Sequence, residues 1–277
     1  MTRWRGISLP PIAGGSDWPF LGDGTTFTAD APASDPAAAG SANTKGSWVQ
    51  AIASTPFPSS GIMLSLMGSS GSGTNFLVDV GIGGSGSEQV LISNLAIFEL
   101  GGGTWGTGWA SMFLPVAIPA STRIAVRAQA NVASRTCRCR MNLIAKGRSG
   151  PALGTFCDTY GALTATSLGT AVTGASSGVW GSWTQLSASL SRTTRWLALL
   201  AAQQSADEFY HVRFGLGSSG NEKNLGIEWV TLGRSGLLLP SSFSAPIALP
   251  AGERLSAAVM TEAGSSQALQ LVAYAVG

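Results

Sequence analysis

Hydrophobic and polar residues alternate over short stretches of this chain, which is the pattern of β-strands rather than of helices. Runs such as NFLVDVGI (75–82), EQVLISNLAIFEL (88–100) and STRIAVRAQA (121–130) contain many β-branched residues and are bounded by Gly, Ser, Pro and Asn. The second half repeats the pattern in FYHVRFGLG (209–217) and RLSAAVMTE (254–262). The sequence therefore predicts many short strands joined by turns.

One segment, TRWLALLAAQQSADEF (194–209), also has the character of a helix, because its apolar run does not alternate. Its place in the repeat described next corresponds to SSGIMLSLMGSSGSGTNF (59–76), where glycines disfavour a helix. We therefore predict a strand there.

The chain carries an internal duplication. FLVDVGIGGSGSE (76–88) returns as YHVRFGLGSSGNE (210–222), with six of thirteen residues identical at an offset of 134. GSW (46–48) returns at an offset of 135, and PVAIPASTRIAVRAQA (115–130) returns as PIALPAGERLSAAVMT (246–261) at an offset of 131. Three matched blocks in one order predict two copies of one domain, at 46–148 and 181–277.

We predict an all-β fold with two tandem antiparallel β-sandwich domains of jelly-roll type, because each copy supplies seven or eight strands and glycine-rich turns. Residues 149–180 form a connector whose apolar residues can lie against either sandwich. Residues 1–45 contain few large apolar groups and predict an extended N-terminal arm. The aromatic side chains in this arm make it a candidate docking segment, and they are Trp4, Trp18 and Phe20.

Charged residues make up 11% of the chain, and the net charge is +2. A surface with so little charge suits a protein that neighbours bury in an assembly, although a neutral all-β protein has the same composition. The charge is too small to favour nucleic acid. The longest aliphatic run, WLALLAA from Trp196, is far shorter than a membrane helix, and the N-terminus lacks the apolar core of a secretory signal. We expect neither a nucleic-acid nor a membrane partner.

The stretches GIGGSG (81–86) and GLGSSG (215–220) match the glycine pattern of dinucleotide-binding loops. That chemistry needs a helix that begins at the glycines, so that the helix N-terminus faces the pyrophosphate. A strand follows here instead, so both stretches are predicted to be hairpin loops, and no cofactor is expected.

Two acidic residues follow these loops at matched positions, Glu88 and Glu222. A matched position indicates a structural role, such as accepting hydrogen bonds from the loop amides, and the alternative is a ligand-binding role. The matched arginines Arg123 and Arg254 are candidate ion-pair partners for them. Two further matched residues, the tryptophans at 48 and 183, are predicted to belong to the two cores.

The three cysteines are Cys137, Cys139 and Cys157. In RTCRCRMNL the first two alternate with arginines, so a strand would place both thiols on one face and Arg138 and Arg140 on the other. An odd count gives no closed disulfide framework. A metal site would need a fourth ligand, and the single histidine lies in the other copy. We predict reduced structural thiols and no metal.

A catalytic set is not apparent. His211 is the single imidazole, and its counterpart in the first copy is Leu77. The chain has no nucleophile elbow and no histidine-rich metal motif. A glycosidase needs two carboxylates at a defined separation, and no pair is indicated by spacing. We therefore expect no enzymatic activity and name no catalytic residue.

Two sets of residues are candidate contacts for a glycan or a protein partner. Trp105 and Trp109 lie in a glycine-rich insertion of the first copy, where they can stack on sugar rings, fill a neighbour's pocket or cap the sandwich end. Arg138 and Arg140 lie in a stretch from residue 100 to residue 157 that has no acidic residue. That stretch is either a solvated face or a contact with an acidic partner.

The segments LPVAIPASTRIAVRAQA (114–130) and IALPAGERLSAAV (247–259) resemble strands in structural proteins of tailed bacteriophages and gene transfer agents. The second segment fits the pattern more closely, because it keeps the glycine that is Ser121 in the first copy. The resemblance covers both sandwiches. It implies a virion component that forms a symmetric homo-oligomer and projects from the head or tail of the particle.

On this basis the expected function is a head spike or fibre that attaches a phage-like particle to cell-surface polysaccharide. The arm would anchor it to capsid or other virion proteins. The protein would be made in the bacterial cytoplasm and released by lysis. The alternatives are a tail-fibre or tail-tip protein, a free carbohydrate-binding adhesin module and, less favoured, a polysaccharide depolymerase.

Overall fold

A computed structural model describes residues 35–68, 74–97, 109–145, 153–204, 208–232, 242–262 and 267–277. Every regular element in these ranges is a β-strand, and none of the described residues forms a helix able to cross a membrane. The strands are β1 (Val49–Ile52), β2 (Ser59–Gly68), β3 (Phe76–Ile82), β4 (Gln89–Ile97), β5 (Trp109–Leu114), β6 (Ile124–Ala130), β7 (Cys137–Ala145), β8 (Cys157–Tyr160), β9 (Thr170–Thr173), β10 (Thr184–Ser187), β11 (Thr194–Gln204), β12 (Phe209–Leu216), β13 (Lys223–Leu232), β14 (Ser242–Leu249), β15 (Leu255–Thr261) and β16 (Ala268–Val276).

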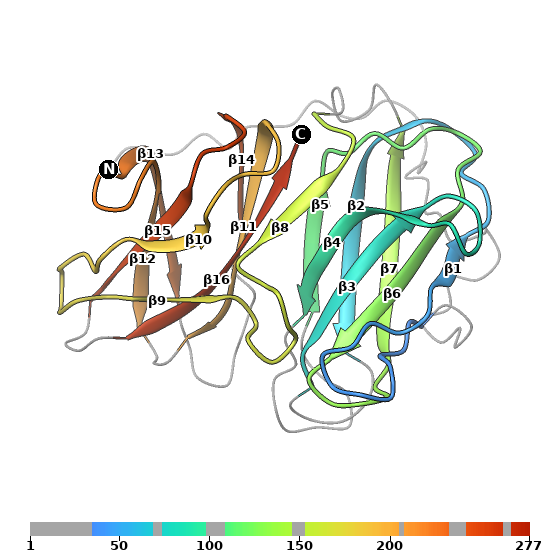
Figure 1. Cartoon of the computed structure of the whole chain (residues 1–277), viewed down its shortest axis with the longest axis horizontal. Coiled ribbons are helices and arrows are strands. Elements are labelled where there is room, and N and C mark those ends of the chain that lie inside the picture. Colours follow the sequence, from blue (N-terminus) through green and yellow to red (C-terminus); the bar gives the residue numbers. More distant parts are fainter. Residues whose placement is uncertain are drawn as a thin grey trace, which may run out of the picture.

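Each copy of the repeat folds into an antiparallel β-sandwich (Figure 1). The first copy places the strands β1-β6-β3-β4 against the strands β5-β2-β7. The second copy repeats this order, with β10-β15-β12-β13 against β14-β11-β16. The prediction of an all-β fold with two tandem sandwiches is confirmed, and the strand predicted for TRWLALLAAQQ is β11.

The two sandwiches share one continuous sheet. Strand β8, which lies in the predicted connector, pairs antiparallel with β16 and meets β4 at Ile92 and Cys157. The four-stranded sheet of the first copy therefore continues into the three-stranded sheet of the second (Figure 1). The next connector strand, β9, also pairs with β16.

The shared sheet explains why β11 does not alternate between apolar and polar residues. Leu197 and Leu199 pack into the core of the second sandwich, whereas Ala198 and Leu200 pack into the core of the first. A strand that is buried on both faces needs apolar residues throughout. On the neighbouring strand β16, the hydroxyl of Tyr274 accepts a hydrogen bond from the backbone amide of Ala96 at 2.8 Å. The core of the first sandwich therefore includes side chains from the second copy.

The glutamates after the glycine loops have the structural role predicted for them. Arg123 Nη1 donates to Glu88 Oε1 at 2.8 Å, and the Gly86 amide donates to the other carboxylate oxygen at 3.0 Å. The second copy has the matching pair of Arg254 and Glu222. This pair lowers the pKa of the Glu222 carboxyl, since Arg254 stabilises its charged form. Both predicted ion pairs are confirmed.

One matched turn differs in backbone strain between the copies. Ser121 has a φ of 58°, and the corresponding Gly252 has a φ of 85°. A left-handed backbone costs a residue with a side chain about 1–2 kcal/mol. We expect Ser121→Gly to raise the free energy of unfolding by about 0.5–1 kcal/mol, because glycine's extra freedom in the unfolded chain cancels part of the gain. Gly252→Ser should lower it by a similar amount. Urea unfolding checks both variants, and a loss of stability in Ser121→Gly would contradict the argument.

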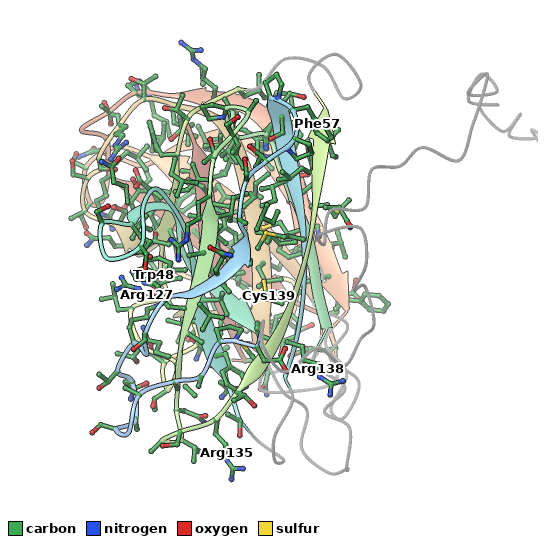
Figure 2. The ribbon with its side chains drawn as sticks, turned by 90° about the vertical axis from the view of Figure 1, so that its right-hand side faces the viewer. Trp48, Phe57, Arg127, Arg135, Arg138 and Cys139 are labelled. Carbon is green, nitrogen blue, oxygen red and sulfur yellow. The ribbon has the colours of Figure 1, made fainter. Side chains whose placement is uncertain are left out.

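All three cysteines are free thiols. Cys137 and Cys157 are buried in the first core, and Cys139 packs against it. Figure 2 shows Cys139 inside the sandwich and Arg138 on its outer side. Burial raises the pKa of all three thiols, in the case of Cys139 to about 12, with nearby Asp35 adding to the effect. Cys137 and Cys139 thus lie on the core side of β7, as predicted, and Arg138 lies on the opposite face.

Candidate functional site

The two copies share their loops but differ on the outer face of the four-stranded sheet. At one cross-strand position the first copy pairs Asp79 with Arg127, and the second copy has Arg213 opposite Ala258. Residues shared by both copies serve the common fold, whereas residues present in one copy are free to serve a ligand. A ligand site is therefore expected where the outer faces of the two copies differ.

A groove of about 480 Å³ lies on this face of the first sandwich, beside β8. Strands β3, β4 and β6 form one wall, and β8 with the turn before β11 forms the other. The lining residues that can interact with a polar ligand are Lys45, Asp79, Asn94, Arg127, Gln129, Asp158 and Arg192. The groove thus lies where the two sandwiches join.

Asp79 organises the first wall. Its side chain is 4% exposed and accepts hydrogen bonds from Lys45 Nζ at 2.7 Å, Arg127 Nε at 2.8 Å and the Asn94 amide at 2.9 Å. Burial lowers the pKa of the Lys45 ammonium, and the attraction of Asp79 for the charged form offsets only part of this effect. Asp79 therefore holds two cations in place on this wall.

An aromatic ring supports the same wall. The Arg127 guanidinium lies 4.5 Å from the ring centre of Trp48, and Figure 2 shows the two side chains next to each other. A Cβ atom added to Gly81 would come within 2.7 Å of the same ring, so the glycine leaves room for it. Trp48 is half-buried on the outer face. The prediction that this tryptophan belongs to the core is therefore wrong, since its ring lies between the sheet and a charged side chain.

The charged side chains of the second wall are more exposed than those of the first, and their ion pair is longer. The Asp158 carboxylate accepts a hydrogen bond from the Ser191 hydroxyl and lies 3.9 Å from Arg192 Nε. The Arg192 guanidinium is 3.8 Å from the ring centre of Phe156, and its side chain is 54% exposed. An exposed guanidinium over an aromatic ring can turn toward a ligand at little cost, because water already reaches it.

Gln129 adds a polar group at the floor of the groove. The residue is 4% exposed, and its side-chain oxygen has no hydrogen-bond partner among the described residues. The groove therefore presents three cationic side chains, two carboxylates and amide groups. This set suits a polar ligand with hydroxyl or carboxylate groups. The described residues contain no cluster of His, Cys, Asp and Glu that could hold a metal ion.

The second sandwich has a different outer face. Arg213 lies 4.3 Å from the ring centre of Trp180 and 4.8 Å from that of Trp183. Trp183 therefore also lies outside the core, which corrects the second tryptophan prediction. His211 Nε2 is 3.4 Å from Glu262 at the same face. Phe209 and Val230 are exposed there at 46% and 51%. This face carries more aromatic side chains than the groove.

Arg138, the predicted partner contact whose side chain the structure describes, does not line the groove. Trp105 and the arm residues Trp4, Trp18 and Phe20 lie outside the described residues. Trp109 on β5 and Arg138 on β7 both lie opposite Met67 of the strand between them, and Arg140 follows two positions later on β7. The side chains of Trp109 and Arg140 are outside the described part. Arg138 is half-buried, with its Nε 3.8 Å from Asp35.

Sequence reasoning missed the groove, although a signal for it was present. Asp79 is a charged residue in the middle of FLVDVGI, a strand that is otherwise apolar, and the matched position in the second copy is Arg213. A buried charge needs a partner, so such a residue points to a polar network. Its partners come from separate segments, and no spacing indicates them.

Comparisons with known proteins do not identify a family. No family model and no curated protein matches the chain. One solved structure that is similar is described as PNGF-II, with 12% identity and a TM-score of 0.32, covering 83% of this chain and 59% of that one. A second is the tandem domain CBM22-1–CBM22-2 of Xyn10C from Paenibacillus barcinonensis, with 11% identity and a TM-score of 0.23, covering 83% of this chain and 82% of that one. The chain thus spans less than two thirds of the first structure, and likeness at these scores says nothing of function.

Proposed function

We propose that this protein binds cell-surface polysaccharide without catalysis and serves as a head spike or fibre of a phage-like particle. The observation that carries the binding part is the groove, whose Asp79–Arg127 pair is replaced by Arg213 and Ala258 at the matched positions of the second copy. Residues that both copies share, such as the Glu–Arg ion pairs, stabilise the common fold. The residues that differ between the copies therefore support a ligand-specific role for the groove.

The chemistry of the groove supports an acidic polysaccharide as the ligand. Lys45, Arg127 and Arg192 outnumber the two carboxylates, so the groove has an excess of positive charge. Guanidinium groups bind carboxylates through paired hydrogen bonds. The Phe156 ring under Arg192 offers an apolar surface for the face of a sugar. The groove lacks a carboxylate that is free of donors, which supports binding rather than hydrolysis.

The expected result for Arg192→Ala is at least a tenfold loss of affinity for an acidic polysaccharide, equal to about 1.4 kcal/mol. Calorimetry with alginate, hyaluronan and polygalacturonate, and with neutral dextran for comparison, measures this. Arg195→Ala is the matched control, because Arg195 is exposed three residues further on and does not line the groove. Equal affinity in both variants, or no binding to any acidic polymer, would contradict the proposal that the groove binds an acidic polysaccharide. Release of new reducing ends would favour a depolymerase.

The particle part of the proposal rests on the resemblance of the two Pro-rich strands and on the low charge of the chain. It implies copies of the protein itself, and capsid or other virion proteins, as partners, and release with the particle by lysis. A free adhesin module is the second candidate, since the groove supports binding equally in that setting.

Light scattering separates these two candidates. We expect the full chain and a chain that starts at Asp35 both to form a defined oligomer. Asp35 is the suitable start, because Lys45 binds Asp79 and Ala38 is buried, which attaches the end of the arm to the first sandwich. A monomer in both cases would support the free adhesin, and assembly of the full chain alone would assign the contact to residues 1–34.

A further inference from the structure

The charged network around Asp79 in the first copy is replaced residue by residue on the outer face of the sheet β10-β15-β12-β13. The matched tripeptide GSW and the shared register of the strands align the two faces. The replacements are Trp180 for Lys45, Arg213 for Asp79 and Ala258 for Arg127. Two cations and one carboxylate in the first copy thus correspond to a single cation beside aromatic rings in the second.

That cation, Arg213, has no carboxylate partner among the described residues. Its guanidinium lies 4.3 Å from the ring centre of Trp180 and 4.8 Å from that of Trp183. Its Nε atom is buried and has no hydrogen-bond acceptor in the part of the chain that the structure describes. A buried donor without an acceptor is unfavourable, so a partner that supplies a carboxylate would stabilise this arrangement.

A carboxylate lies close by on the same face but does not pair with Arg213. Glu228 is exposed on β13, directly opposite Arg213 on β12. Opposite charges at such a position normally attract each other across the strands. Here the Arg213 guanidinium lies against Trp180 and Trp183, whose segment runs along β15, on the side of β12 away from β13. The face therefore carries a cation and an anion that are both available to a partner.

Exposed apolar side chains lie on the same side of this sheet. Phe209 on β12 is 46% exposed, and Val230 on β13 is 51% exposed. Val179, which is 49% exposed, belongs to the segment beside β15, where the Gly178 amide donates to Thr261 O at 2.8 Å. Exposed apolar patches mark interaction sites, and tryptophan and arginine are the residues that contribute most to protein–protein contacts.

We propose that this face binds the same face of a second copy of the chain about a two-fold axis. A two-fold contact forms each residue pair twice, so Arg213 of each copy meets the partner subunit's Glu228. The occupant is a second copy because the face carries both members of a complementary charge pair that does not form within the chain. This inference rests on the homo-oligomer of the proposed function and names its contact surface.

Charge reversal in the full chain, followed by sedimentation velocity, tests the contact. Arg213→Glu and Glu228→Arg should each raise the dissociation constant of the dimer at least a hundredfold, because like charges then face each other twice. An equimolar mixture of the two variants should restore the dimer, since each chain then meets the opposite charge at both positions. Restoration also shows that both variants fold. Arg195→Glu is the matched control, because Arg195 is exposed on β11 of the opposite sheet.

The other outcomes separate this inference from the proposed function. An oligomer that both reversals leave intact would overturn the inference and place the homo-oligomer contact on another surface. Weakened association that the mixture does not restore would also overturn it. So would an odd-numbered oligomer, because a two-fold contact then leaves one face without a partner. An unaltered chain that is monomeric at every concentration would overturn both this inference and the homo-oligomer.

Discussion

Replacing Asp79 with alanine is expected to lower the free energy of unfolding by about 3 kcal/mol, the lower end of the range for breaking a buried ion pair. The carboxylate is 4% exposed and neutralises both Lys45 and Arg127. Its removal leaves two partly buried cations next to each other and the Asn94 amide without its acceptor. The loss is not larger, because both cations reach water. Urea unfolding followed by tryptophan fluorescence measures the change.

Two variants make this result specific. Asp79→Asn retains an oxygen for the Asn94 amide and should cost less than alanine. Glu262→Ala removes a carboxylate that is 58% exposed, and its effect should stay within about 0.5 kcal/mol. A change of less than 1 kcal/mol in Asp79→Ala would mean that the two cations do not depend on this carboxylate.

Replacing Tyr274 with alanine is expected to cost about 3–5 kcal/mol, the usual range for removing a buried aromatic ring. Tyr274 is fully buried, lies on a strand of the second copy and packs into the core of the first. Because both cores share its sheet, thermal unfolding should remain one transition that shifts to lower temperature. Calorimetry checks both the size of the shift and the number of transitions.

The hydroxyl and the ring of Tyr274 can be separated. Tyr274→Phe keeps the ring but leaves the Ala96 amide without its acceptor, which should cost about 1–3 kcal/mol. Asn142 is the matched residue on β7, and Asn142→Ala should cost less than about 1 kcal/mol because this residue is half-buried. Two separate transitions in the unaltered protein would show that the sandwiches unfold independently.

Much of the fold could be predicted because its signals are local or repeated. The glycine loops, the alternating strands and the three matched blocks lie in continuous stretches of sequence. The ion pairs of Glu88 with Arg123 and of Glu222 with Arg254 could be predicted because the duplication supplies the same pair once in each copy. The predicted core positions of Trp48 and Trp183 were wrong, because an aromatic residue that both copies share can belong to a core or can cover a glycine on the outer face of the sheet.

The groove could not be predicted, because its walls come from separate segments spread between residues 45 and 192. Asp79 is joined by Lys45 and Arg127, and Asp158 on β8 lines the other wall of the groove. These residues meet only when a connector strand enters the sheet between β4 and β16.

By itself, the sequence determined the strands, the loops and the duplication, because period-two alternation, glycine conformations and matched blocks are properties of neighbouring residues. Only the tertiary structure decided that the two sandwiches share one sheet, that β11 and β16 are buried on both faces, and that the polar groove lies at their junction. Those features depend on which edges pair, and edge pairing is set by the burial of apolar area between distant segments rather than by local pattern.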